Sequence, residues 1–193
     1  MLVLGSRLNE TPVMSLQTGT RLAQTGTPLI NPANLKIIAF QLEGPLLTEH
    51  PSFLRTADIR EMGSIGMIID DSDELIGLDD VIKIKELHEL NFSLVGMNVI
   101  DEHKRKLGKV DGYTVETSSF VIQQLNVRRG ILRGLTDTGL LIHRSQITEI
   151  NDNAIIVKTT AKKISPEPIL RATRHDYINP FRNPIPQPEQ IDA

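Results

Sequence analysis

The apolar residues of this chain fall into short runs that are rich in isoleucine and valine and are separated by glycine, proline, asparagine and aspartate. Runs of this length and composition predict β-strands bounded by turns. In the first half they are Val13–Leu16, Leu35–Leu42, Leu54–Ile59 and Met67–Ile69, and in the second half Val99–Ile100, Val110–Val115, Phe120–Val127, Gly139–Ile142 and Ala154–Val157. The pattern therefore predicts an all-β fold.

The two halves also align with each other. At an offset of 85 positions, residues 22–42 lie over residues 107–127 without a gap, so that Leu22 meets Leu107 and Ile37 meets Ile122. At an offset of 88, residues 54–62 lie over residues 142–150. A register that drifts by so little across a whole unit predicts an internal duplication.

Both copies change phase at the same point of their long strand. Leu35 and Ile37 point to one face, whereas Phe40 and Leu42 point to the other, and residues 120–127 repeat this pattern. The change predicts a β-bulge near Ile38–Ala39 and its counterpart near Gln123–Gln124. Because bulges bend strands and help small sheets to close, we expect two tandem β-barrels that pack on each other.

The two copies are joined by residues 79–92, for which two interpretations stand. A short helix would be capped by Asp79 or Asp80 and would carry one apolar stripe, formed by Val81, Ile84, Leu87 and His88. The alternative is an extended linker strand.

The last segment, residues 165–193, holds six of the eleven prolines of the chain. Proline lacks a backbone donor and keeps its predecessor extended, so we expect an extended or disordered tail. Its apolar side chains, of which Tyr177 and Phe181 are the main candidates for contacts, could lie in a groove of this chain or of a partner. The expected domains are thus 1–78, 79–92 as linker, 93–164 and the tail.

Several segments of the second copy resemble the PRC-barrel domain family. Residues 94–101 (LVGMNVID), 106–112 (KLGKVDG) and 140–157 are similar to the opening and closing strands of that family. The first copy resembles it more loosely and has Leu22-Ala23 where the second has Leu107-Gly108. PRC-barrels occur in the photosynthetic reaction-centre H subunit and in the ribosome maturation factor RimM. The resemblance implies PRC-like barrels that act as interaction modules without catalytic residues.

Composition removes several classes of chemistry. There is no cysteine, which excludes disulfides, thiol catalysis and cysteine-ligated metals. Aromatic residues make up only 4% and tryptophan is absent, which disfavours a stacking platform for single-stranded nucleic acid. Residues 1–12 lack the features of a signal peptide, and no apolar stretch approaches the roughly 18–20 residues of a membrane helix. We therefore expect a cytoplasmic protein without an integral membrane segment.

Few residues suggest catalysis or metal binding. His143 and Ser145 are two apart on a predicted strand and hence on one face, but no positioned acid or oxyanion hole accompanies them. The acidic run at residues 70–74 lacks the spacing of a calcium loop and is typical of a solvated turn. We expect no enzyme activity, cofactor or metal.

Charge is divided unequally between the two copies. Residues 13–90 hold 6 basic and 12 acidic side chains, whereas residues 91–164 hold 11 basic and 7 acidic ones. The second copy concentrates its charge in a candidate patch for an anionic partner, made of Lys104, Arg105, Lys106, Lys109, Arg128, Arg129 and Arg133. The main functional hypothesis is an adaptor or scaffold that binds a protein partner. The alternative is an RNA- or ribosome-associated assembly factor that uses this patch.

Overall fold

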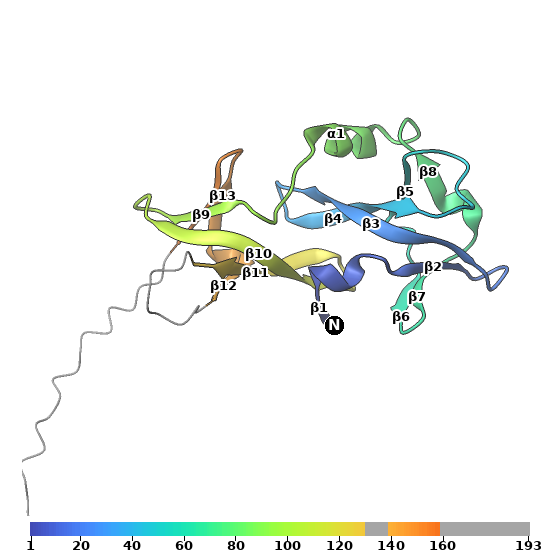
Figure 1. The fold of residues 1–193 in the computed structure, drawn as a ribbon, viewed down its shortest axis with the longest axis horizontal. Helices are drawn as coiled ribbons and strands as arrows, with labels where there is room; N and C mark the ends of the chain where they lie inside the picture. The colour runs from blue at the N-terminus through green and yellow to red at the C-terminus, as the bar shows by residue number, and fades with distance from the viewer. Residues whose placement is uncertain (130–138, 159–193) are drawn as a thin grey trace, which may run out of the picture. The chain divides into compact units, whose positions relative to one another are not determined.

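The computed structural model describes residues 1–129 and 139–158, and half of these residues lie in strands (Figure 1). The first half contains β1 (Leu2–Leu4), η1 (Gly5–Leu8), β2 (Pro12–Ser15), β3 (Arg21–Asn31), β4 (Lys36–Glu43), β5 (Ser52–Arg55), β6 (Glu61–Gly63), β7 (Gly66–Ile69), η2 (Ser72–Glu74), β8 (Leu75–Gly77) and α1 (Ile82–Leu90). The second half contains β9 (Asn98–Asp101), β10 (Lys106–Glu116), β11 (Val121–Arg128), β12 (Leu140–His143), η3 (Arg144–Gln146), β13 (Ile147–Ile150) and β14 (Ala154–Val157). The η elements are short 3₁₀ helices.

The strands of the two halves are paired in the same order. In the first half, β2, β3, β4 and β5 pair antiparallel in sequence, β7 pairs parallel with β2, and β6 pairs with β7. In the second half, β9 to β14 repeat these pairings one for one. Corresponding strands are offset by 85 residues at β3 and β10 and by 88 at β5 and β12, which are the two offsets of the sequence alignment.

The predicted bulges are present in both halves. In the β3–β4 pair, Leu29 faces Ala39 and Ile30 faces Ile37, so Ile38 is the extra residue. The β10–β11 pair skips Gln123 in the same way. A second pair of irregularities lies at Leu22 and Leu107, where β2 and β9 meet the long strands. The change of face seen in the sequence therefore has the cause that was expected.

The halves meet where β4 and β11 begin. Lys36 pairs antiparallel with Val121, its equivalent at an offset of 85. The Ile37 amide donates to the Phe120 carbonyl at 2.9 Å, and the Ile122 amide donates to the Leu35 carbonyl at 2.8 Å. This exchange is symmetric, so a local two-fold relation connects the two copies of the unit.

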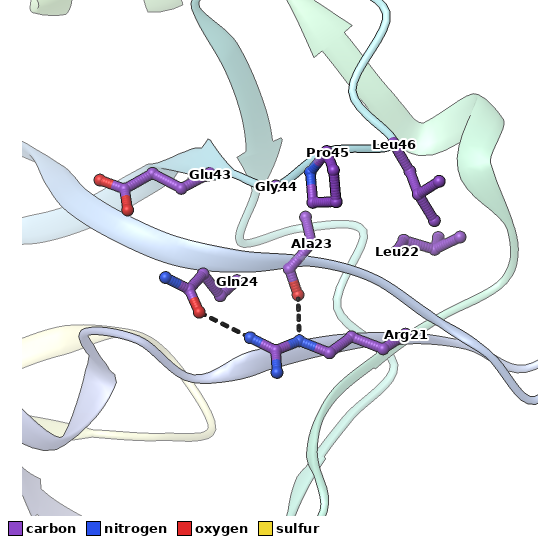
Figure 2. A pocket seen from close by; sticks show the side chains of 8 residues that line it. All are labelled: Arg21, Leu22, Ala23, Gln24, Glu43, Gly44, Pro45 and Leu46. Carbon is purple, nitrogen blue, oxygen red and sulfur yellow. Dashed lines mark hydrogen bonds between the residues drawn. The ribbon is translucent and has the colours of Figure 1, made fainter.

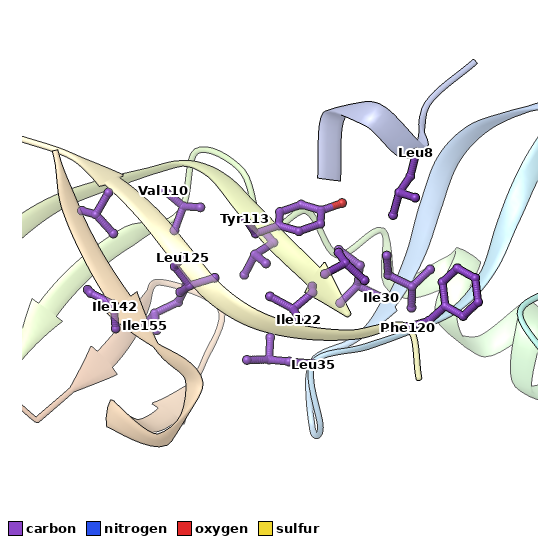
Figure 3. Close-up of a cluster of buried hydrophobic side chains, with 14 of the residues drawn as sticks. Leu8, Ile30, Leu35, Val110, Tyr113, Phe120, Ile122, Leu125, Ile142 and Ile155 are labelled. Carbon is purple, nitrogen blue, oxygen red and sulfur yellow. The ribbon is translucent and has the colours of Figure 1, made fainter. Parts of the chain in front are cut away.

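One apolar core spans both halves. It includes Phe40 and Met67 from the first half. Its members Ile122, Leu125 and Ile155 from the second half are shown in Figure 3. The rings of Phe40 and Phe120 lie edge to face, with centroids 6.0 Å apart. Two smaller apolar clusters belong to the first half alone. The halves are therefore stabilised by shared burial as well as by the strand pairing.

Helix α1 confirms the helical interpretation of the linker but not its predicted cap. Val81 is the N-cap, whereas the Asp80 carboxylate accepts from the Gly77 amide at 2.6 Å and Asp79 pairs with Lys85. The apolar stripe is real, because Ile84 and Leu87 are buried against Leu29, Ala39 and Phe53. The side chains of Asp79 and Asp80 contact Lys85 and the Gly77 amide instead of the first helical amides, so the helix begins without a side-chain cap.

The N-terminal strand crosses to the other half. β1 pairs antiparallel with β10, with Val3 opposite Val115. The following η1 places Leu8 in the shared core, at 1% exposure. Leu2–Leu4 thus belongs in sequence to the range 1–78 but completes the sheet of the second half.

The prediction of an all-β fold is confirmed in outline, with one short α-helix. The described strands pair into a single sheet that is not closed. Residues 54–59 were expected to be one strand, but β5 ends at Arg55 and a turn follows, in which Arg55 pairs with Asp58. The tail, with Tyr177 and Phe181, lies outside the described residues.

Candidate functional site

The basic side chains of the predicted patch gather at one end of the β10–β11 hairpin. Lys109 lies directly opposite Arg128. At Gly108 the two strands approach so closely that a Cβ would lie 2.2 Å from the carbonyl oxygen of Arg128. Arg129 follows Arg128, and the β9–β10 turn brings in the last three members, Lys104, Arg105 and Lys106. All six are exposed, while Arg133 lies outside the described residues. We call these six residues the basic end.

A buried aspartate shapes the turn that carries half of the basic end. The Asp101 carboxylate accepts from the His103 amide at 2.9 Å, from the Arg105 amide at 2.8 Å and from the Arg105 Nε at 2.6 Å. Lys104 has a φ of 62° and so occupies the left-handed region. Burial raises the pKa of Asp101, but the hydrogen bonds from Arg105 and His103 lower it by more, so the pKa lies below its ordinary value.

Ion pairs neutralise only part of the basic end. Arg105 pairs with Asp101, and Arg128 pairs with Asp111 at 2.7 Å. Within the described ranges, Lys104, Lys106, Lys109 and Arg129 form no ion pair. Four exposed cations at the end of one hairpin attract an anionic surface, and because they are solvated the attraction depends on salt.

The equivalent end of the first half has a different chemistry. Arg21, Gln24, Glu43 and Gly44 stand where the second half has Lys106, Lys109, Arg128 and Arg129. There the guanidinium of Arg21 donates to the Ala23 carbonyl at 3.3 Å and to the Gln24 side chain at 2.6 Å (Figure 2).

Residues 21–24 and 43–46 line a cavity of about 430 Å³ at this end of the first half. This cavity was not predicted from the sequence, although several of its lining residues are equivalent to residues of the basic end at the offset of 85. The same position in the two halves thus presents a hollow with one arginine and one glutamate in the first and a basic surface in the second.

His143 and Ser145 are in contact, but not as neighbours on a strand. His143 ends β12, whereas Ser145 lies in η3, and their side chains are 2.8 Å apart. The His143 ring accepts from the Ser145 amide, and the Gln146 side chain accepts from the His143 amide. The predicted placement on one strand is therefore wrong, and the pair caps the 3₁₀ turn.

The acidic run forms a compact turn. Asp71 caps η2, the Glu74 carboxylate accepts from the Asp70 amide at 3.0 Å, and Asp70 pairs with Arg60. Partial burial raises the pKa of Glu74. In the residues that the structure describes, no group of three or more histidine and acidic side chains is arranged to hold a metal ion.

Two further results bear on the site. No helix within residues 1–129 and 139–158 is long and apolar enough to cross a membrane. Comparisons with protein-family models and with curated proteins find no match to this chain. Any functional proposal therefore has to be argued from the residues of the chain itself.

Proposed function

We propose that this chain is a non-catalytic interaction module, an adaptor or scaffold that binds a protein partner. The proposal includes two tandem PRC-like barrels derived from one duplicated unit. It is supported by the repeated strand order and by the bulges at equivalent positions, Ile38 and Gln123. The fold alone does not give the function, so the argument rests on the surfaces that the two copies present.

The observation that carries the proposal is the basic end. Two copies of one unit have the same backbone arrangement here, yet Lys109 and Arg128 in one copy stand where Gln24 and Glu43 stand in the other. Lys104, Lys106, Lys109 and Arg129 make no ion pair with a described residue, and exposed charges contribute little to folding because they remain solvated. Their concentration in one copy favours a role in binding, and we propose an acidic segment of a partner protein as the ligand.

The same charges favour RNA as a second candidate. Phosphate contacts come from lysine and arginine side chains, and the affinity they give falls steeply as salt rises. In this alternative the chain is an RNA- or ribosome-associated assembly factor, and the basic end contacts the phosphate backbone.

A pull-down with the full chain tests both proposals. The bait is compared with a variant that carries Lys106→Glu and Lys109→Glu, and with a control that carries Arg21→Glu at the equivalent end of the first half. The adaptor proposal predicts a discrete protein that survives nuclease and is lost only with the double variant. Material that disappears on nuclease treatment supports the RNA alternative. Identical capture by all three baits would refute a role for the basic end.

A further inference from the structure

A cavity distinct from the basic end lies where the two copies of the unit meet. It has a volume of about 460 Å³, which is within the range of small-ligand pockets. It is lined by residues from four segments: Leu4 and η1, β3, the segment after α1, and β10 with its neighbour β11. Two of these segments, β3 and β10, are equivalent, since Thr27 and Pro28 correspond to Gly112 and Tyr113 at the offset of 85. Equivalent residues of the two halves therefore face the same cavity.

Equivalent residues of the two halves line the cavity with different side chains. Tyr113 places an aromatic ring on one side, and the ring lies so close to Gly5 that a Cβ there would be 2.3 Å from its Cε2. At the corresponding position of the first half stands Pro28, which has no ring of that length. The room that a second ring would fill is thus left open beside Pro28.

Tyr113 also brings an unsatisfied polar group to the cavity. The residue is 7% exposed, and its hydroxyl points toward η1, where Gly5 and Ser6 line the cavity (Figure 3). In the described part of the chain, no hydrogen bond is made by this hydroxyl. Burial raises the pKa of Tyr113 to about 12, so the phenol is protonated at neutral pH and can donate. A ligand group that accepts a hydrogen bond from this phenol would be oriented by it in the cavity.

The other lining residues define the chemistry of the occupant. Among the lining residues that the structure describes, the one charged residue is Asp111, whose carboxylate is paired with Arg128. Ile30 and Leu94 supply apolar surface, and further amide and hydroxyl side chains come from Asn9, Ser93 and Asn126. Among the described residues, no lysine or arginine lines the cavity, which favours a neutral occupant over an anion.

The surroundings favour a peptide. Leu4, at the end of β1, lines the cavity at 49% exposure, and Val95 on another lining segment is 50% exposed. β1 is itself an extended segment that this region of β10 accepts as an added strand. A peptide has main-chain carbonyls that can accept from the Tyr113 phenol and main-chain amides that can donate to the polar lining side chains. One of its apolar side chains can pack on Ile30 and Leu94.

We propose that this cavity, which we call the Tyr113 cavity, binds a neutral extended peptide segment and takes one bulky apolar side chain of it beside Pro28. The phenol of Tyr113 donates a hydrogen bond to a main-chain carbonyl of the peptide. None of the six residues of the basic end lines this cavity, although its Asp111 pairs with Arg128 of the basic end.

The test is a titration of the full, ¹⁵N-labelled chain with blocked tripeptide amides that have phenylalanine, leucine, alanine or aspartate at the centre. The phenylalanine and leucine probes should give saturable shifts at the amides of Gly5, Ser93 and Gly112, with a dissociation constant of about 1 mM, as expected of a fragment. The aspartate and alanine probes should bind at least several-fold more weakly. Equal shifts with all four probes, or none that saturate, would overturn the proposal.

Three variants make the test specific. Tyr113→Phe keeps the ring and should weaken binding by about 3- to 10-fold, as expected for one neutral hydrogen bond. Pro28→Tyr restores the missing ring and should abolish binding. Thr18→Val, which removes an exposed hydroxyl far from the cavity lining, should leave it unchanged.

Two comparisons separate this proposal from its neighbours. N-benzylacetamide, which offers the ring without the extended main chain, should bind more weakly than the phenylalanine tripeptide, and equal binding would overturn the assignment to a peptide. The Lys106→Glu and Lys109→Glu variant should bind the tripeptide as the wild type does. A failure of the basic end in the pull-down is thereby distinguishable from a failure of the Tyr113 cavity.

Discussion

Replacing Phe40 by alanine tests whether the two halves share one core. The Phe40 side chain is fully buried, and its ring lies 6.0 Å from that of Phe120 at an interplanar angle of 73°. Truncating a buried phenylalanine to alanine costs roughly 3–5 kcal/mol, since it removes apolar burial and leaves a cavity. About 0.5–1.5 kcal/mol of such a loss comes from the edge-to-face pair of rings. In a unit of about 150 residues, each kcal/mol lowers Tm by roughly 2–4 °C, so we expect a drop of roughly 6–20 °C.

The assay is urea and thermal denaturation followed by far-ultraviolet circular dichroism. Leu46→Ala is the control, because this leucine is 65% exposed and its truncation should change stability by less than about 0.5 kcal/mol. The Phe120→Ala variant and the double variant complete a cycle, in which the two changes should be less than additive by about 0.5–1.5 kcal/mol. A loss under about 1 kcal/mol for Phe40→Ala, or two separate transitions in the wild type, would refute the shared core.

Three further outcomes are expected. Gly108→Ala should lower stability by roughly 1–3 kcal/mol in urea titrations, because φ is +156° there and a Cβ would meet the Arg128 carbonyl; wild-type stability would contradict the close strand approach. Gly5→Ala should cost roughly 1–3 kcal/mol by pressing on the Tyr113 ring, and an unchanged Tm would show that the ring moves freely. The folded state lowers the pKa of Asp101, so this carboxylate stabilises the fold above its ordinary pKa of 3.8 and loses that effect as the pH falls through the lower folded-state value. Asp101→Asn should therefore flatten the dependence of Tm on pH below 3.8, and an unaltered acid profile would contradict the assignment.

The strand order could be predicted largely from the sequence because burial dictates the alternation of side chains. The phase change between Ile37 and Phe40 located one bulge, and Ile122 and Leu125 located the other. The offsets of 85 and 88 matched corresponding strands because the repeat keeps the same inward positions. The apolar side chains of core residues show in the sequence which positions are buried, which is why this part of the fold could be predicted.

Features that depend on a distant partner were not accessible. Nothing in residues 2–4 shows that they pair with residues 114–116 of β10, which lie at least 110 positions away in the sequence. Asp80 looked like a helix cap, yet its carboxylate bonds to Gly77, and choosing between the two needs the folded geometry.

The position of the glycine that allows the close strand approach also could not be predicted from the sequence. The second half has Gly108 at the close approach of its strands, whereas the first half has Ala23 at that position. The first half instead has Gly44 directly after the opposite strand β4, where a Cβ would lie 3.2 Å from the Ala23 Cα. The substitution looked like a departure from the repeat, and only the pairing shows the compensating glycine.

The basic end was predicted as a set of residues but not as a surface. Charge counting found Lys109 and Arg128, and the hairpin register puts them opposite each other. The two ion pairs, with Asp101 and Asp111, could not be foreseen, because they depend on side-chain direction. The Tyr113 cavity was missed entirely, since its lining comes from four separate segments.

The exchange of hydrogen bonds between Leu35–Ile37 and Phe120–Ile122 is self-complementary: each copy offers the other the group that it receives. Two identical subunits make contacts of this kind in an isologous dimer. Joining the subunits in one chain makes their association intramolecular, so dilution no longer separates them. In one chain the two halves need not have identical sequences. One half can therefore carry a basic surface where the other half does not. Covalent linkage thus leaves the two ends of this molecule free to differ in charge, as Glu43 and Arg128 do.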